Sequence, residues 1–410
     1  MLQDLQYNDT QGSRKLLNSV ANFMNWHFRC HKPLGEDNIL IANGVTSLLN
    51  SLAFAIADEG SSILLPTPSY GMFSHDIITR NSLSLVPVAC DDIVVERFQC
   101  QSSNSASCWQ SELVRRLEKA FNNNILNGRK TAAVLLANPE NPLGRCYDSL
   151  VLVEVSRFCE KNQLHLIVDE IYAATAFSNH HSMLSLDLGS NMENVHVIWG
   201  MSKDFGCGGL RLGFLATYNT KLHAAMRTLS MFSWVSAWSA AVASLILEDR
   251  DFLRNVYFPT LKNRLETRRN RVMAWLTRLE VPFVAPEAGF FVFVDLSKWL
   301  NKVPTQTKGN SAELEFLSLL MTNRVFLEPG QAFFSAKPGW FRLNFGKEER
   351  TVDLGLQRLA GFLQLVEFSG KIDDSEDETF EKFGSPPRPG EKTKSRRWRH
   401  YLCFGSGDYA

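Results

Sequence analysis

The chain has 410 residues, of which 45% are hydrophobic, and its 43 basic side chains balance 43 acidic ones. A chain of this length folds as about two domains, and a formal net charge of zero argues against nucleic acid or an anionic membrane as a partner. No apolar stretch is long enough to cross a bilayer and no signal peptide opens the chain, which favours a cytoplasmic protein. The eight cysteines form no C-x-x-C pair and the histidines show no metal-ligand spacing, so the sequence predicts no disulfide scaffold and no metal site.

Helical and strand patterns alternate over the first 220 residues. The predicted strands are short, nearly continuous apolar segments, which is typical of a mostly parallel sheet covered on both faces. They lie at Ser62–Pro66, Leu83–Val88, Thr131–Ala137, Leu164–Val168, Val195–Trp199 and Leu210–Thr217. Apolar residues at helical spacing predict helices between them, at Ser47–Ala57, Ser111–Phe121 and Leu150–Lys161.

The later part of the chain has a different pattern. Long helices are predicted at Leu222–Glu248 and Tyr257–Leu279, and strands at Phe290–Asp295 and Trp340–Phe345. We therefore predict a large domain over residues 1–264 and a smaller α/β domain over residues 265–366. From residue 367 the sequence is acidic, then rich in proline and glycine, then basic, which predicts a disordered tail over 367–410. A docking peptide is the alternative for this tail.

Three polar side chains directly follow predicted strands. Ligands of open α/β sheets bind beyond the carboxyl ends of the strands. Lys203 follows one strand, where its amine could lose a proton and attack an aldehyde, although an ordinary surface lysine is the alternative. Asp169 ends another strand, and a buried carboxylate there needs a partner such as a protonated pyridine nitrogen, unless it is a helix N-cap. Asn141 begins the second of two Asn-Pro steps, which could aim its amide inward, although an ordinary turn is the alternative.

Other segments are suited to an anion or an aromatic ring. Gly44–Thr46 opens the helix predicted at 47–57, and the free N–H groups of a helix N-terminus suit a phosphate. Arg211 follows a glycine-rich run and could clamp the same phosphate. Tyr70 could stack on a planar ring. Tyr172 could donate to a ring hydroxyl or simply pack in the core. Arg342 lies inside an apolar strand, so we expect it to meet an anion such as a substrate carboxylate.

Taken in chain order, these segments resemble the class I/II aminotransferases of pyridoxal-phosphate (PLP) fold type I. The sequences of these motifs are most similar to those of 1-aminocyclopropane-1-carboxylate synthase and its animal synthase-like homologues. The matching segments are Gly-x-Thr at 44–46, Pro-x-Tyr at 68–70, Asn-Pro-x-Asn-Pro-Leu-Gly at 138–144, Asp-Glu-Ile-Tyr at 169–172, Ser-Lys-Asp-Phe-Gly at 202–206 and Phe-Arg at 341–342. The resemblance covers about residues 5–366. It implies an α/β fold with a mostly parallel sheet in the large domain, a smaller C-terminal α/β domain, and pyridoxal 5′-phosphate as cofactor.

The resemblance also implies a role for each residue. Lys203 would form the Schiff base with the cofactor and move the substrate Cα proton, Asp169 would pair with the pyridine nitrogen, and Tyr70 would complete the catalytic set by stacking on the ring. Arg342 and Asn141 would bind the substrate, a small α-amino acid. Further cofactor contacts are implied for Asn141 and Tyr172 at the ring hydroxyl, for Val45 and Ser202, for Thr46 and Arg211 at the phosphate, and for Tyr7, which would reach the phosphate of the other subunit of a homodimer.

Two departures from the family pattern keep the function open. Gly200 stands where the family often has a phosphate-binding serine, so one donor is lost. The family also has a segment before the equivalent of Tyr7, which contributes a dimer arm, so the sequence reads as a shortened chain. We therefore expect an aminotransferase or a 1-aminocyclopropane-1-carboxylate synthase-like lyase. The alternative is a catalytically silent or truncated PLP-fold protein with a binding or regulatory role.

Overall fold

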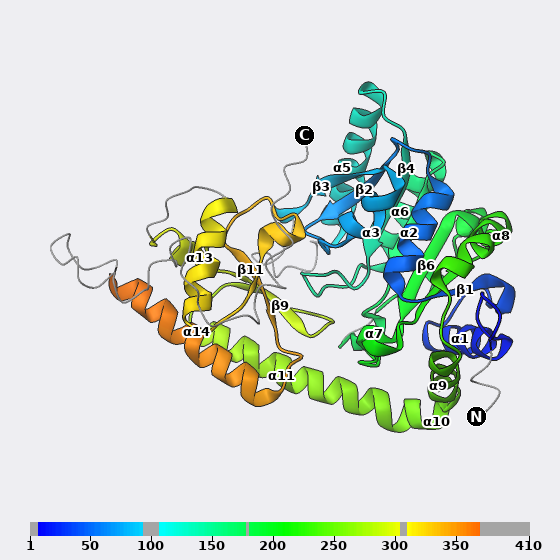
Figure 1. The fold of residues 1–410 in the computed structure, drawn as a ribbon. Coiled ribbons are helices and arrows are strands. Elements are labelled where there is room, and N and C mark those ends of the chain that lie inside the picture. Colours follow the sequence, from blue (N-terminus) through cyan, green and yellow to red (C-terminus); the bar gives the residue numbers. More distant parts are fainter. Residues whose placement is uncertain (1–6, 93–105, 178–179, 304–309, 370–410) are drawn as a thin grey trace, which may run out of the picture.

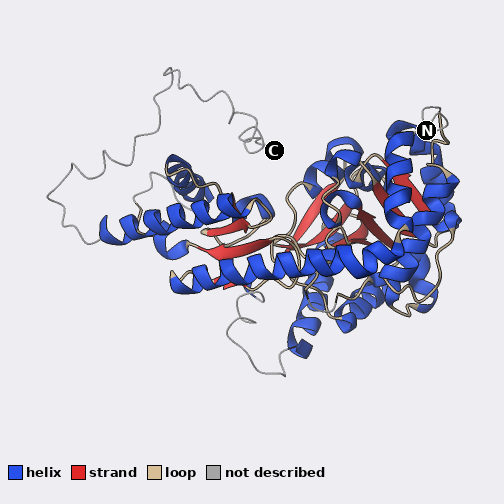
Figure 2. Cartoon of the chain, turned by 90° about the horizontal axis from the view of Figure 1, so that it is seen from below, coloured by secondary structure: helices blue, strands red, loops and turns tan. Residues whose placement is uncertain are grey.

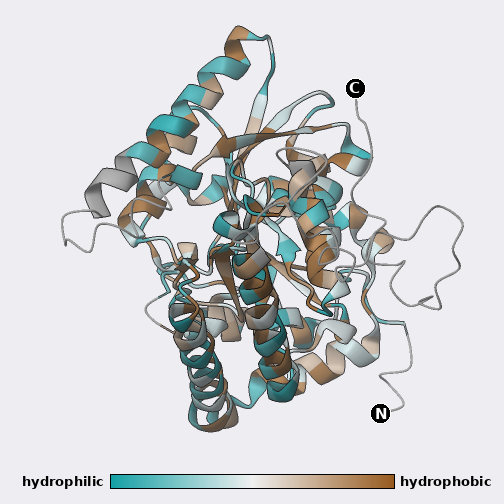
Figure 3. Cartoon of the chain, turned by 90° about the vertical axis from the view of Figure 1, so that its left-hand side faces the viewer, coloured by the Kyte–Doolittle hydropathy of each residue, from teal (hydrophilic) through white to brown (hydrophobic). Residues whose placement is uncertain are grey.

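The computed structural model describes residues 7–92, 106–177, 180–303 and 310–369. Within these residues the chain builds two β-sheets with helices packed against them (Figure 1). A seven-stranded sheet has the order β1-β7-β6-β5-β4-β2-β3, and a four-stranded sheet has the order β10-β11-β9-β8. Figure 3 shows hydrophobic residues along the central strands and hydrophilic residues on the outward faces of the helices.

The larger sheet is mostly parallel, as the sequence predicts. Its strands β2 to β6 pair in parallel, and β7 is antiparallel to both β6 and β1. Its strands are β1 (Ile39–Ala42), β2 (Ser62–Thr67), β3 (Ser84–Ala89), β4 (Thr131–Ala137), β5 (His165–Asp169), β6 (Val195–Gly200) and β7 (Gly213–Thr217). Every residue of β2, β4, β6 and β7 is buried, because helices cover both faces of the sheet.

Two groups of helices form the two hydrophobic cores beside this sheet. On one face, apolar side chains of α1, α5, α6 and α9 pack on strand residues such as Val134 and Leu136. On the other face, α2, α3 and α8 pack on the alternate strand residues, such as Ala133 and Leu135. The helices are α1 (Arg14–His27), α2 (Val45–Ile56), α3 (Phe73–Asn81), α5 (Ala106–Leu126), α6 (Ser149–Lys161), α7 (Met201–Asp204), α8 (Thr220–Leu229), α9 (Ala237–Glu248) and α10 (Arg250–Phe252).

The smaller sheet is antiparallel and has its own hydrophobic core. Its strands are β8 (Phe283–Val284), β9 (Phe291–Asp295), β10 (Glu328–Pro329) and β11 (Trp340–Asn344), and its helices are α12 (Ser297–Leu300), α13 (Asn310–Thr322) and α14 (Glu349–Ser369). The long helix α11 (Phe258–Arg278) runs alongside both sheets (Figure 2). The division of the chain near residue 264 stays a prediction, and residues 370–410 of the predicted tail lie outside the described residues.

The helix predicted at Leu222–Glu248 is wrong, because the structure breaks it. Helix α8 ends at Leu229, a 3₁₀ turn follows at Ser230–Ser233, and α9 begins at Ala237. At the break, Ser230 Oγ donates to the Arg227 carbonyl over 2.8 Å, a side-chain hydrogen bond that competes with regular helical bonding. The Ser233 carbonyl accepts instead from the amide of Asn43, 2.9 Å away.

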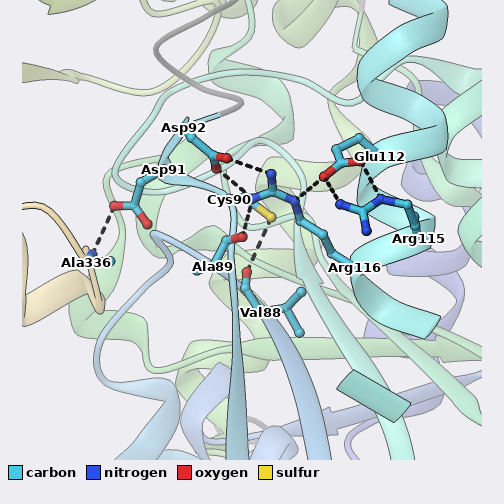
Figure 4. Close-up of polar contacts among 9 residues, drawn as sticks. All are labelled: Val88, Ala89, Cys90, Asp91, Asp92, Glu112, Arg115, Arg116 and Ala336. Carbon is cyan, nitrogen blue, oxygen red and sulfur yellow. Dashed lines mark hydrogen bonds and ion pairs between the residues drawn. The ribbon is translucent and has the colours of Figure 1, made fainter. Parts of the chain in front are cut away.

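The two sheets meet through a loop of the smaller one, residues 330–336. The Ser69 amide donates to the Phe333 carbonyl over 2.9 Å, and a Cβ atom at Gly71 would lie only 1.8 Å from the Ala332 carbonyl oxygen. Asp91 Oδ1 accepts the Ala336 amide over 3.0 Å (Figure 4). Arg116 pairs with the neighbouring Asp92 in the same view, which anchors this segment to α5. These contacts hold the smaller sheet against the carboxyl ends of the larger one.

Candidate active site

A cavity of about 170 Å³ lies at the carboxyl edge of the larger sheet. Strands β2, β4, β5 and β6 are neighbours and run in parallel, so the residues that follow them meet at one edge. The cavity is lined by Val45, Thr46, Leu49, Tyr70, Phe73, Asp76, Ala137, Asn141, Asp169, Ile171, Tyr172, Ser202, Lys203 and Arg211. Nine of the residues singled out from the sequence are in this set, so the structure brings them together.

Lys203 reaches the cavity from α7, one turn beyond the end of β6. The next residue, Asp204, fixes this turn because its buried carboxylate accepts Trp199 Nε1 over 2.8 Å and the Ala174 amide over 3.0 Å. Burial, and then the positive charge of Arg342, lower the pKa of the Lys203 amine. A lysine with a lowered pKa carries a larger share of neutral amine, which is the nucleophilic form.

Asp169 ends β5 with its carboxylate buried at the cavity wall. Its Oδ1 accepts the Ile171 amide over 3.1 Å, and no α-helix begins at this residue, so the helix N-cap interpretation does not hold. Burial raises the pKa of the Asp169 carboxyl to about 7. A carboxylate buried in this way is stabilised by a cationic partner in the cavity.

Asn141 is held by a turn that a buried ion pair closes. Arg145 Nη2 lies 2.7 Å from Glu140 Oε2, and the Tyr147 hydroxyl donates to Glu140 Oε1 over 3.0 Å. The Glu140 amide also donates to the Arg145 carbonyl over 2.8 Å. The turn therefore has a fixed shape, and Asn141 Oδ1 accepts Arg342 Nη1 over 2.6 Å.

One end of the cavity has the features of an anion site. Thr46 lies in the first turn of α2, whose N-cap Gly44 has a φ of 111°, and a Cβ atom at Gly44 would lie 2.6 Å from Arg211 Nη2. The glycine therefore lets the guanidinium approach the free amides of the helix N-terminus. Gly200, at the end of β6, also has a packing reason, since a Cβ atom there would lie 2.7 Å from the Leu212 carbonyl oxygen. A serine would not fit this backbone without a shift.

Two predicted residues lie outside the cavity wall. Tyr7 is 93% exposed and stacks on Trp234 with ring centroids 5.4 Å apart. Arg342 comes from β11 and lies between the rings of Phe291 and Phe333, whose centroids are 5.1 Å and 4.8 Å from Cζ. Arg342 thus borders the site from the smaller sheet, through its hydrogen bond to Asn141.

Sequence reasoning missed two acidic residues of the site. Asp76 lines the cavity from α3, and burial raises its pKa to about 6 while the Thr46 side chain donates a hydrogen bond that opposes this shift. Glu328 forms an ion pair with Arg342 across β10 and β11. An anion of the chain itself therefore already lies beside Arg342, and its pairing with a substrate carboxylate stays a prediction. Neither acid follows a long strand, so the pattern that found Lys203 and Asp169 could not find them.

Comparison with known proteins shows the family of the chain. The family described as aminotransferase class I and II matches residues 3–359. The chain belongs to this family. The human 1-aminocyclopropane-1-carboxylate synthase-like protein 1 is 33% identical over 374 residues, which cover 88% of this chain and 71% of the human protein. A second human relative, the "probable inactive 1-aminocyclopropane-1-carboxylate synthase-like protein 2", is 30% identical and covers 88% and 62%.

The fold is that of the solved aminotransferases. Aspartate aminotransferase from Thermus thermophilus superimposes with a TM-score of 0.72 at 20% identity, over 88% of this chain and 84% of that one. This confirms the predicted α/β fold of PLP fold type I. Members of the family are pyridoxal 5′-phosphate enzymes that act on amino acids and are commonly dimeric. Within the described part of the chain, no helix is long and apolar enough to span a membrane.

Proposed function

We propose that this chain is a PLP-dependent enzyme that acts on an α-amino acid, either as an aminotransferase or as a 1-aminocyclopropane-1-carboxylate synthase-like lyase. The observation that carries the proposal is the meeting of Lys203, Asp169 and Asn141 at one cavity, from three neighbouring strands. These three residues supply an amine, a carboxylate and an amide donor. That set matches the reactive groups of pyridoxal 5′-phosphate, which are an aldehyde, a pyridine nitrogen and a ring oxygen.

The residues of the cavity fit the cofactor along its whole length. Thr46, Val45 and Ser202 would hold the phosphate with Arg211, whose approach Gly44 permits. Tyr70 would cover the ring, with Asn141 and Tyr172 at its hydroxyl. Asp169, buried and without a cation bonded to it in the described structure, would receive one from the protonated ring nitrogen. When bound, the cofactor supplies an aldehyde and a ring that withdraws electrons from the substrate Cα.

The chemistry of the chain's own groups follows from their surroundings. Lys203 Nζ, whose pKa burial lowers, would attach the cofactor and later accept the proton from the substrate Cα. Asp169 would keep the ring nitrogen protonated. Tyr70, whose pKa burial raises to about 12, would stay a neutral hydroxyl that donates hydrogen bonds. Arg342 and Asn141 would orient the substrate carboxylate.

An absorption spectrum of the PLP-loaded full chain tests this assignment. We expect a visible band in the wild type, loss of that band in Lys203→Ala, and a shift of the band when amino acids are added. Lys221→Ala is the matched control, because Lys221 is exposed on α8, and it should behave as the wild type. A folded wild-type protein without the band would refute the proposal.

A catalytically silent protein is the second candidate. It is favoured by the similarity to a human relative whose name calls it probably inactive. In that case the band would form with Lys203, yet no amino acid would be consumed. Product analysis separates the branches, since a keto acid indicates transamination and a cyclopropane amino acid indicates the lyase reaction.

We further propose that the protein is a homodimer. The segment between α8 and α9 exposes Met231 and Phe232 at 61% and 76%, and the first turn of α9 exposes Trp238 at 48%, next to the stacked pair of Tyr7 and Trp234. An exposed cluster of this kind suits burial against a second copy. Tyr7 would then reach the partner's phosphate site. Light scattering should give twice the chain mass, and Phe232→Glu should halve it; a wild-type monomer would contradict the proposal.

A cytoplasmic location stays a prediction of the sequence.

A further inference from the structure

The ion pair between Arg342 and Glu328 places a carboxylate of the chain where a substrate carboxylate is expected. The two residues face each other in the register of β10 and β11, and Arg342 Nη2 donates to Glu328 Oε2. Arg342 is 13% exposed and Glu328 is 40% exposed, so the arginine is enclosed while the glutamate is accessible. The pair is therefore open on the glutamate side.

Both terminal nitrogens of the Arg342 guanidinium already donate a hydrogen bond. Nη1 donates to Asn141 Oδ1 over 2.6 Å and Nη2 donates to Glu328, while buried Nε has no hydrogen-bond partner among the described residues. Arginine binds a carboxylate best through two parallel hydrogen bonds from one edge of the guanidinium. Because Nε is buried, a substrate carboxylate has to reach the guanidinium through Nη1 and Nη2, and it then competes with Glu328 for Nη2.

Glu328 also acts on the interior of the site. The pKa of Lys203 is lowered first by burial and then by Arg342, and Asp169 and Glu328 oppose this shift. Burial raises the pKa of Tyr70 and of Tyr172, and the charge of Glu328 adds to both shifts. Its carboxylate is thus close enough to affect a charge on the substrate.

The charges around Arg342 determine which substrates are compatible with this part of the site. Arg342 and Glu328 together are neutral, and an α-carboxylate that displaces Glu328 leaves one uncompensated negative charge beside it. A second positive charge on the substrate restores neutrality by pairing with the displaced Glu328. An amino acid with an uncharged side chain cannot do this, and the resulting repulsion disfavours its binding.

We propose that Glu328 is a specificity-determining residue that selects α-amino acids with a cationic side chain. The inference rests on the proposed function, because it assigns the substrate class of the same site. Glu328 competes with every incoming carboxylate for Arg342, and only a cationic substrate compensates its release. The preference follows from charge and not from the length of the side chain.

Calorimetric titration of the PLP-loaded full chain tests this, with arginine, lysine and ornithine compared with citrulline, norleucine and norvaline. We expect the cationic amino acid of each pair to bind roughly tenfold more tightly in the wild type. Glu328→Gln should remove the difference, by strengthening the binding of the uncharged amino acids and weakening that of the cationic ones. Glu59→Gln, at an exposed glutamate near the opposite ends of the strands, should leave the difference unchanged.

Several outcomes would overturn the inference. These are equal affinities within the pairs, a preference that survives in Glu328→Gln, or no heat with any of the six amino acids. Tighter binding of agmatine, which is arginine without its carboxylate, would show instead that Glu328 never leaves Arg342. The visible band of the same samples reports the proposed function separately, since its absence refutes cofactor attachment while the heats still rank the ligands.

Discussion

Two arginine–glutamate pairs flank Asn141, and they differ in what encloses them. The side chains of Arg145 and Glu140 are 8% and 11% exposed, and the carboxylate also accepts the Tyr147 hydroxyl. The side chains of Arg342 and Glu328 are 13% and 40% exposed, and the glutamate is accessible at the site. An arginine–glutamate pair fixes a turn when protein groups surround both partners. When the glutamate is accessible, a ligand carboxylate can take its place beside the arginine.

Breaking the enclosed pair should have the largest effect. Glu140→Ala removes the carboxylate that forms an ion pair with the buried Arg145 guanidinium, so we expect the free energy of unfolding to fall by about 3–5 kcal/mol. Urea unfolding followed by fluorescence measures this change. A loss below about 1 kcal/mol would show that the enclosure of this pair has no energetic importance.

Breaking the pair of Arg342 and Glu328 should change the pKa of Lys203. Arg342 lowers the pKa of this amine and Glu328 raises it, so Arg342→Gln should raise the pKa and Glu328→Gln should lower it. The neutral amine attacks the aldehyde, so the rate of PLP attachment rises with pH. This rise should occur at higher pH in Arg342→Gln and at lower pH in Glu328→Gln. Stopped-flow absorption measures both profiles, with Glu59→Gln as control. Shifts in the same direction would contradict the assigned charges.

Breaking the pair of Arg342 and Glu328 should have the smallest effect, and that effect is on stability. Glu328→Gln should change the free energy of unfolding by no more than about 1 kcal/mol, because the glutamate is partly solvated. Arg342 keeps its bond to Asn141 and its contacts with two phenylalanine rings. The same urea titration applies, and a loss as large as that of Glu140→Ala would remove the distinction between the two pairs.

The sequence predicts the larger sheet well because its strands are buried on both faces. Segments such as Thr131–Ala137 are apolar throughout, and β4 has the same bounds. It does not predict β1 or β10, which have four and two residues and too little pattern to be found. The break between α8 and α9 was missed because apolar spacing continues through it, whereas serine side chains and a distant amide decide the backbone there.

The residues of the candidate site also differ in whether the sequence predicts them. Lys203, Asp169 and Asn141 could be found because each lies at the end of an apolar strand or shortly after it, and parallel strands bring their carboxyl ends to one edge. Glu328 could not be found, since its importance comes from its register with Arg342 across a two-residue strand. Asp76 lies on a helix without a turn motif, and only tertiary packing brings it to the cavity.

Gly71 has a consequence for how the two sheets can move. Its lack of a side chain lets the Ala332 carbonyl rest against the turn between β2 and α3, where a Cβ atom would lie 1.8 Å from that oxygen. The absence of a side chain at Gly71 therefore sets how closely the loop of the smaller sheet packs on this turn of the larger one. Replacing one hydrogen atom at this position by a methyl group would insert a wedge between the two sheets.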